Sequence, residues 1–234
     1  MNEKPILFNA EMVNAILSGR KTQTRRIMKV QPEPSKSRSG DYWFPCNKMQ
    51  SMVHVSDLLP GNPYMPDAHE FFSTCCPLGG IGDQLWVREA FAAGLCTEST
   101  LAYRATHKTE DLEEGWGETI KWTPSIHMPR WASRINLLIT GVRVERLRDI
   151  SEQDAMAEGI TAKEVIIETR YEGGGHVEIT AERFFFVGGD DEGYESAGEA
   201  FAELWDSIYG QKEGENWQAN PWVWVIEFER MEAK

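Results

Sequence analysis

A short basic segment combines the side chains that acyl-transfer chemistry needs. Residues 19–26 read Gly-Arg-Lys-Thr-Gln-Thr-Arg-Arg, with four cations and two hydroxyls. An amine can act as a general base, a hydroxyl as a nucleophile, and a guanidinium as a hydrogen-bond donor to a developing anion. A basic cluster in an acidic protein also indicates a site for an anionic or electron-rich ligand. The alternative is a solvated basic turn that follows a helix.

The charge distribution limits the kind of anion that the chain can bind. The 234 residues carry a formal net charge of −13, and 41% of them are apolar, enough for a substantial core. Residues 1–39 hold eight Lys or Arg and three Glu, a net charge of +5, so the remainder carries −18. An acidic body disfavours non-specific binding to duplex DNA. A local basic patch suits a small or single-stranded anionic ligand better.

A strand and a helix are expected to position the basic segment. Pro5–Phe8 is typical of a short buried strand, and Asn9 is a candidate N-cap for a helix with apolar residues at 12, 13, 16 and 17. Gly19 follows as the expected terminator. The negative end of the helix dipole explains Arg20 and Lys21 structurally, but it does not explain the two arginines further along.

Spacing sets a geometric condition on Lys21 and Thr24. Residues three apart point to opposite faces of an ideal strand, whereas they share a face on a helical turn. Joint action of the amine and the hydroxyl therefore requires a corner near Lys21, and Gly19 makes such a corner feasible.

A second helix places an acid in an unusual position. Ser151 is the expected N-cap and Gly159 the terminator, so Glu158 lies in the last turn. Carboxylates are disfavoured there by the helix dipole, which indicates that another requirement holds Glu158 in place.

The remaining pattern predicts many short strands and one further helix. We expect a turn at Gly82-Asp83, strands at 84–91, 101–103, 134–140, 142–147 and 221–228, a hairpin of 164–169 with 177–180, and an amphipathic helix around 201–208. Gly141 is interpreted as a bulge or bend. Residues 31–80 are expected to form a long irregular insertion, a lid or partly ordered excursion. The prediction is an α+β fold: a small β-barrel with peripheral helices in a single domain.

Several segments together resemble the ASCH domain family. They are Gly19-x-Lys21-x-x-Thr24-x-Arg26, the Gly82-Asp83 turn, Ile150-Ser151-Glu152 with Glu158-Gly159, and the closing strand 224–228. The resemblance covers about half of the chain. It implies a PUA-like β-barrel over residues 1–234, with insertions at about 31–80 and 161–195, and binding of RNA or modified nucleosides. The chain departs from the family pattern GxKxxExR by placing Thr24 where Glu is common.

With Thr24 at this position, the segment resembles that of the compact bacterial ASCH enzymes that hydrolyse N4-acetylcytidine to cytidine and acetate. The resemblance implies Lys21, Thr24 and Glu158 as the catalytic residues, with a closer motif match for the first two. Lys21 would serve as the base for the Thr24 hydroxyl if neighbouring cations lower the proton affinity of its ammonium group. Glu158 would orient Lys21 or carry a proton to the leaving amine. Residues 122–130 also resemble the W-x-P-S-x-H-M-P-R stretch of longer phage- and prophage-encoded ASCH proteins.

Cationic and aromatic side chains are the candidates for substrate binding. They are Arg20, Arg25, Arg26, Trp86, Arg88, Glu89, Arg130, Trp131 and Arg134. Core packing is the alternative for the tryptophans. Pairing with neighbouring residues is the alternative for Arg88 and Glu89, and simple surface exposure is the alternative for Arg130 and Arg134.

No cofactor or metal is predicted. The five histidines show no paired spacing, and a zinc site from Cys46, His54, His69 and Cys75 or Cys76 matches no standard finger. With no CxxC pair, signal peptide or long apolar run, we expect reduced cysteines, a cytoplasmic location and no membrane partner. The sequence does not predict an oligomeric state.

Two functions remain open at this level. One is an amidohydrolase acting on N4-acetylcytidine-like substrates. The other is a non-catalytic module that binds single-stranded RNA or a modified nucleotide. A single-strand nuclease ranks last because no carboxylate cluster for metal binding is evident.

Overall fold

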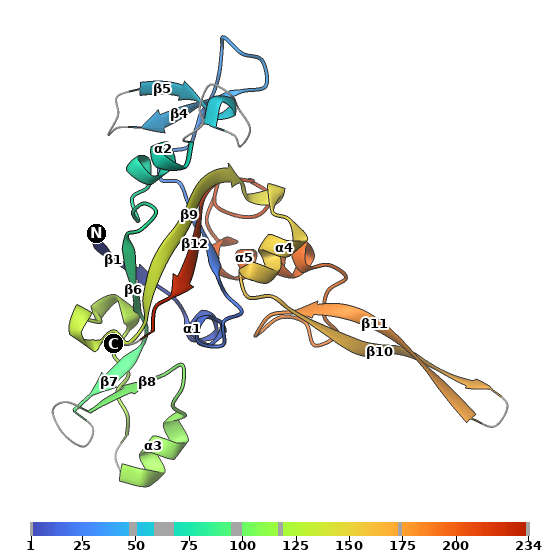
Figure 1. The fold of residues 1–234 in the computed structure, drawn as a ribbon. Helices are drawn as coiled ribbons and strands as arrows, with labels where there is room; N and C mark the ends of the chain where they lie inside the picture. The colour runs from blue at the N-terminus through green and yellow to red at the C-terminus, as the bar shows by residue number, and fades with distance from the viewer. Residues whose placement is uncertain are drawn as a thin grey trace. The chain divides into compact units, whose positions relative to one another are not determined.

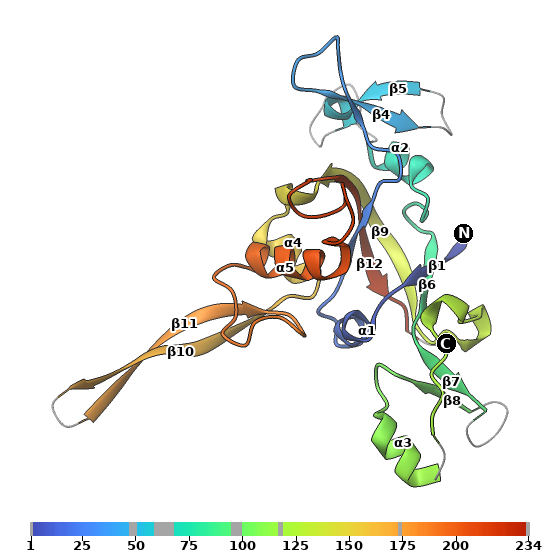
Figure 2. The ribbon, with the colours of Figure 1, turned by 180° about the vertical axis from the view of Figure 1, so that it is seen from behind.

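The computed structural model describes residues 2–46, 51–58, 68–94, 100–116, 119–172 and 175–232. Its contacts divide the chain into two compact units, residues 1–145 with 222–234, and residues 146–221. Helices and strands are mixed in both units (Figures 1 and 2). The expectation of one ASCH domain over 1–234 stays a prediction.

A five-stranded sheet forms the centre of the first unit. Its order is β1-β6-β9-β12-β2, with β1 and β6 parallel and β12 and β2 antiparallel. The strands are β1 (Glu3–Leu7), β6 (Gln84–Arg88), β9 (Asn136–Arg146), β12 (Trp222–Arg230) and β2 (Gln23–Ile27). Within the described chain β1 and β2 stay edge strands, and no closed barrel is found.

The edges of this sheet are nonetheless linked by a side chain. Arg26 on β2 donates from Nη2 to the carbonyl oxygen of Leu7 on β1 at 2.7 Å. The helix α1 (Ala10–Leu17) connects the two strands. Apolar side chains from β12, β9 and α1 form the core, and alternation along β6 buries Leu85 and Val87 as expected.

The bulge or bend expected at Gly141 lies inside one continuous strand, β9, along which the buried positions shift from 137, 139 and 141 to 142 and 144. An added Cβ at Gly141 would lie 2.5 Å from Glu227 Oε2, so close approach also favours glycine there. The described part of 31–80 is not irregular, against the expectation. It holds β3 (Glu33–Pro34), β4 (Tyr42–Cys46), β5 (Ser51–His54), the 3₁₀ turn η1 (Val55–Leu58) and α2 (Ala68–Cys75).

Smaller elements complete the first unit. They are β7 (Phe91–Ala93), β8 (Leu101–Tyr103), α3 (Thr109–Trp116) and two 3₁₀ turns, η2 (Ser125–His127) and η3 (Arg130–Ala132). The strand predicted at 101–103 is confirmed.

The second unit consists of two packed helices and a long hairpin. Its elements are the 3₁₀ turn η4 (Leu147–Asp149), α4 (Glu152–Ala157), β10 (Thr161–Glu172), β11 (Gly175–Phe185) and α5 (Ala197–Tyr209). Both carboxylate oxygens of Glu152 accept hydrogen bonds from the first turn of α5, at Ala197 N and Gly198 N. The predicted hairpin and both helices are confirmed.

Candidate functional site

A corner follows α1, as the sequence requires. Gly19 adopts φ +76°, and the backbone N–H of Lys21 still donates to Ala15 O in the helix at 3.0 Å. The strand β2 begins only at Gln23. Lys21 therefore belongs to the helix end, and the alternation of strand side chains does not apply between it and Thr24.

One aromatic ring identifies the face on which the amine lies. The Lys21 Nζ atom is 5.8 Å from the ring centroid of Phe8, and the Arg26 guanidinium is 5.1 Å from the same centroid. Phe8 also contacts Phe228 of β12 at 6.3 Å. Because side chains two apart in a strand share a face, Thr24 lies on the Arg26 side of β2. Lys21 and Thr24 therefore serve the same face of the sheet.

Both of these residues are buried. Lys21 and Thr24 are each 2% exposed, against the usual surface position of a lysine. The reading of residues 19–26 as a wholly solvated turn is therefore wrong at these two positions.

The neighbouring arginines have internal partners. The Arg25 side chain is fully buried, and its Nη2 atom pairs with Glu145 Oε1 on β9. Arg26 binds the Leu7 carbonyl, as described above. Arg20 is exposed and donates from Nε to Ser18 Oγ at 3.0 Å. Binding of substrate by these three side chains stays a prediction.

Glu158 lies in the second unit as the C-cap of α4. Ser151 caps the helix through a hydrogen bond from Asp154 N to its Oγ atom at 3.1 Å, and the Glu158 N–H donates to Asp154 O at 2.9 Å. The side chain is 5% exposed. A buried carboxylate at this end of a helix agrees with the expectation that something besides the helix retains it. Its catalytic role stays a prediction.

Three of the predicted binding residues gather at one ring. The guanidinium carbons of Arg88 and Arg130 lie 5.2 and 5.9 Å from the Trp86 ring centroid. Arg88 Nε also donates to Met128 O at 2.9 Å, and Arg130 forms a two-pronged ion pair with Glu3 at 2.9 and 3.1 Å. That pairing holds the pKa of the Glu3 carboxyl below its ordinary value.

Glu89 and Arg134 bind each other, a pairing that the sequence did not indicate. Their two hydrogen bonds measure 2.8 and 3.0 Å. Arg134 also lies over the ring of Tyr103, 4.0 Å from its centroid. Burial raises the pKa of the Tyr103 phenol, against the opposing effect of Arg134. The strand of Tyr103, β8, was expected, but this contact was not, because Tyr103 and Arg134 lie far apart in the sequence. Trp131 is 67% exposed and is a free aromatic surface rather than core.

The described side chains hold no group of three His, Cys, Asp or Glu arranged to bind a metal. Cys75 is disulfide-bonded and Cys76 is a buried free cysteine, so the expectation of a reduced thiol is wrong for Cys75. The side chains of Cys46 and His69, two of the zinc-site candidates, lie outside the described residues. No helix in the described chain is long and apolar enough to cross a membrane.

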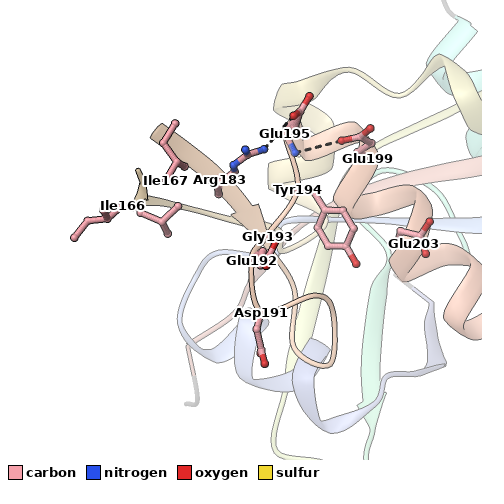
Figure 3. A pocket seen from close by; sticks show the side chains of 11 residues that line it. Ile166, Ile167, Arg183, Asp191, Glu192, Gly193, Tyr194, Glu195, Glu199 and Glu203 are labelled. Carbon is pink, nitrogen blue, oxygen red and sulfur yellow. Dashed lines mark hydrogen bonds and ion pairs between the residues drawn. The ribbon is translucent and has the colours of Figure 1, made fainter. Parts of the chain in front are cut away.

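The second unit contains a pocket that the sequence analysis missed. Its volume is about 750 Å³, and Figure 3 shows its lining from β10, β11, the loop between β11 and α5, and α5 itself. Five carboxylates line it, from Asp191, Glu192, Glu195, Glu199 and Glu203, together with Arg183. Arg183 pairs with Glu195 at 3.4 Å. This lining favours cations and is unsuited to a nucleic-acid backbone.

No protein-family model, curated protein or solved structure matches the chain.

Proposed function

We propose that this chain is an ASCH-domain protein with a PUA-like fold that hydrolyses the exocyclic amide of an acylated pyrimidine nucleoside such as N4-acetylcytidine. Lys21, Thr24 and Glu158 are the proposed catalytic residues. The observation that carries the proposal is a buried amine at a helix–strand corner, on the same face as a buried hydroxyl three residues away.

The PUA-like part of the proposal rests on the main sheet. Its edge strands β1 and β2 are joined by the Arg26 side chain instead of a backbone ladder. In a closed barrel the two edge strands are joined to each other. In this chain the hydrogen bond from Arg26 to Leu7 would take the place of the backbone ladder between β1 and β2.

The reaction divides into acyl transfer and hydrolysis. The Thr24 Oγ1 atom attacks the acetyl carbonyl carbon while neutral Lys21 accepts the hydroxyl proton. The C–N bond then breaks, and the cytosine amine leaves with a proton delivered through Lys21 or Glu158. Water attacks the acetyl-threonine ester, releasing acetate and restoring the hydroxyl. Arg26 or a backbone N–H stabilises the oxyanion.

Turnover of N4-acetylcytidine tests the proposal. The full chain is expected to release cytidine and acetate, and K21M and E158Q to lower kcat/KM by at least about 100-fold. K29M removes an exposed cation just after β2 that is not a candidate site residue, and it is the control expected to retain turnover. Absence of turnover by folded wild-type protein, or K21M as active as wild type, would overturn the catalytic proposal.

Binding without chemistry is the second candidate, and exposed Trp131 favours it. An exposed indole can stack on an unpaired base of single-stranded RNA. W131A is then expected to weaken salt-dependent RNA binding, whereas K21M leaves it unchanged.

A further inference from the structure

Ser35, His54 and Asp57 lie next to one another in and around the sheet of β3, β4 and β5, separate from Lys21 and Thr24. The Oγ atom of Ser35 lies 2.8 Å from His54 Nε2. On the other side of the imidazole, Nδ1 is 3.8 Å from Asp57 Oδ2. The order is that of a nucleophile, a base and an orienting carboxylate.

The imidazole is held in place by its surroundings. His54 is 6% exposed and is paired across the strands with Trp43. The two rings stack with centroids 3.8 Å apart and an interplanar angle of 30°. The Asp57 carboxylate on the Nδ1 side favours a proton on Nδ1, and in that tautomer Nε2 accepts the hydrogen bond of the Ser35 hydroxyl. This is the tautomer that a general base needs.

The hydroxyl oxygen of Ser35 also accepts hydrogen bonds from two backbone N–H groups. The backbone N–H groups of Ser37 and Arg38 donate to Ser35 Oγ at 3.2 and 3.1 Å. Hydrogen bonds to the charged form of a group favour that form, so these donors stabilise negative charge as the hydroxyl loses its proton. Ser35 is half-buried, and solvent reaches it.

The carboxylate is shared, which limits the chemistry. Arg38 Nη1 pairs with Asp57 Oδ1 at 2.6 Å. This cation fixes the orientation of Asp57, but it weakens the support that the carboxylate gives to an imidazolium. A weakly supported base suits esters with good leaving groups better than amides.

We propose that Ser35 is the nucleophile of an esterase site, with His54 as its general base and Asp57 as a positioning residue. Ser35 Oγ bonds to the ester carbonyl carbon as His54 Nε2 takes its proton. The C–O bond to the alcohol breaks, and the alcohol leaves with that proton. Water then attacks the acyl-serine with His54 again as the base, releasing the carboxylic acid and restoring Ser35.

A fluorophosphonate probe tests the nucleophile directly, because it forms a stable covalent bond to an activated serine. The folded full chain is incubated with the probe, and the adduct is located by peptide mass spectrometry. We expect it on Ser35. An absence of any adduct on wild-type protein overturns the proposal, and so does an adduct only on Ser37, whose Oγ atom lies 3.4 Å from the same nitrogen.

Variants separate reactivity from folding, with thermal unfolding as the check that each one folds. S35A is expected to abolish labelling, and H54Q to slow it by about 100-fold or more. D57N is expected to slow labelling and D57E to restore it. S207A removes an exposed hydroxyl of α5, outside the proposed site, and is the control that keeps the wild-type rate. H54Q labelled at that rate would overturn the role of the base.

Activity on a simple ester completes the test. The chain is expected to hydrolyse p-nitrophenyl acetate, with activity lost in S35A and retained in T24V. Loss in T24V with retention in S35A would assign the ester activity to the other site and overturn this proposal. The outcome is thus independent of whether N4-acetylcytidine is a substrate.

Discussion

Arg134 and Glu89 form a two-pronged ion pair in which the carboxylate is almost completely buried. The two N–O distances are 2.8 and 3.0 Å, and the Glu89 side chain is 3% exposed. Arg134 pairs with that buried charge. Its ring contact with Tyr103 adds packing to the charge interaction. The pair therefore fixes the segment after β6 against the segment that leads into β9.

Removing the cation should leave a buried charge without compensation. We expect R134M to lower the free energy of unfolding by about 3 kcal/mol, measured by urea denaturation at pH 7. E3Q is the control, since it breaks the exposed pair with Arg130 and should change stability little. Equal losses of unfolding free energy in R134M and E3Q would show that the burial of Glu89 does not make its ion pair more important for stability.

The hydroxyl of Thr24 can be removed with little change of shape. We expect T24V to lower kcat/KM for N4-acetylcytidine by at least about 100-fold, because Val retains the β-branched form without the nucleophile. T24S restores a hydroxyl and should recover much of the activity. A T24V protein that turns over at the wild-type rate would exclude Thr24 as the nucleophile.

The corner at Gly19 should depend on its left-handed backbone. We expect G19A to destabilise the protein by about 1–2 kcal/mol, because φ is +76° and a Cβ is strained there. No neighbouring atom would clash with that Cβ. G19N should cost less, since Asn tolerates this region better than Ala. Thermal unfolding of the two variants distinguishes backbone strain from crowding, which would penalise Asn more.

Local signals predicted the elements around the candidate site well. Asn9 and Ser151 both cap helices through their side chains, as expected. The strand 221–228 is apolar on both faces, which is typical of a central or a barrel-closing strand, and β12 lies between β9 and β2. Capping and periodicity act over a few residues, so a sequence displays them directly.

Capping and periodicity do not reveal contacts between residues that lie far apart in the sequence. Arg25 lies 120 positions from Glu145, so its use in an internal ion pair could not be inferred from spacing. The insertion at 31–80 was misread because its strands are short and include Pro34 and Pro45. Its order comes instead from packing of Phe44 against Trp224, with ring centroids 5.9 Å apart. Ser35 and His54 meet only because that sheet forms.

Asp83 should make stability depend on pH in the acid range. Its carboxylate accepts hydrogen bonds from Asn2 N at 2.8 Å and Gly80 N at 3.1 Å, and these lower the pKa of Asp83 below its ordinary value. A lowered folded-state pKa contributes stability above the unfolded-state pKa of about 4 and loses it as the pH falls through the folded-state value.

We therefore expect D83N to unfold at a lower temperature than wild type at pH 7, with the difference shrinking progressively below about pH 4. The cause is hydrogen bonding to backbone N–H groups more than attraction between charges, so the difference at pH 7 should persist in about 1 M salt. A difference that is constant from pH 7 to pH 2 would show that D83N acts through altered turn geometry instead of ionisation. A difference that disappears in salt would assign the effect to the nearby charges of the N-terminus and Lys4.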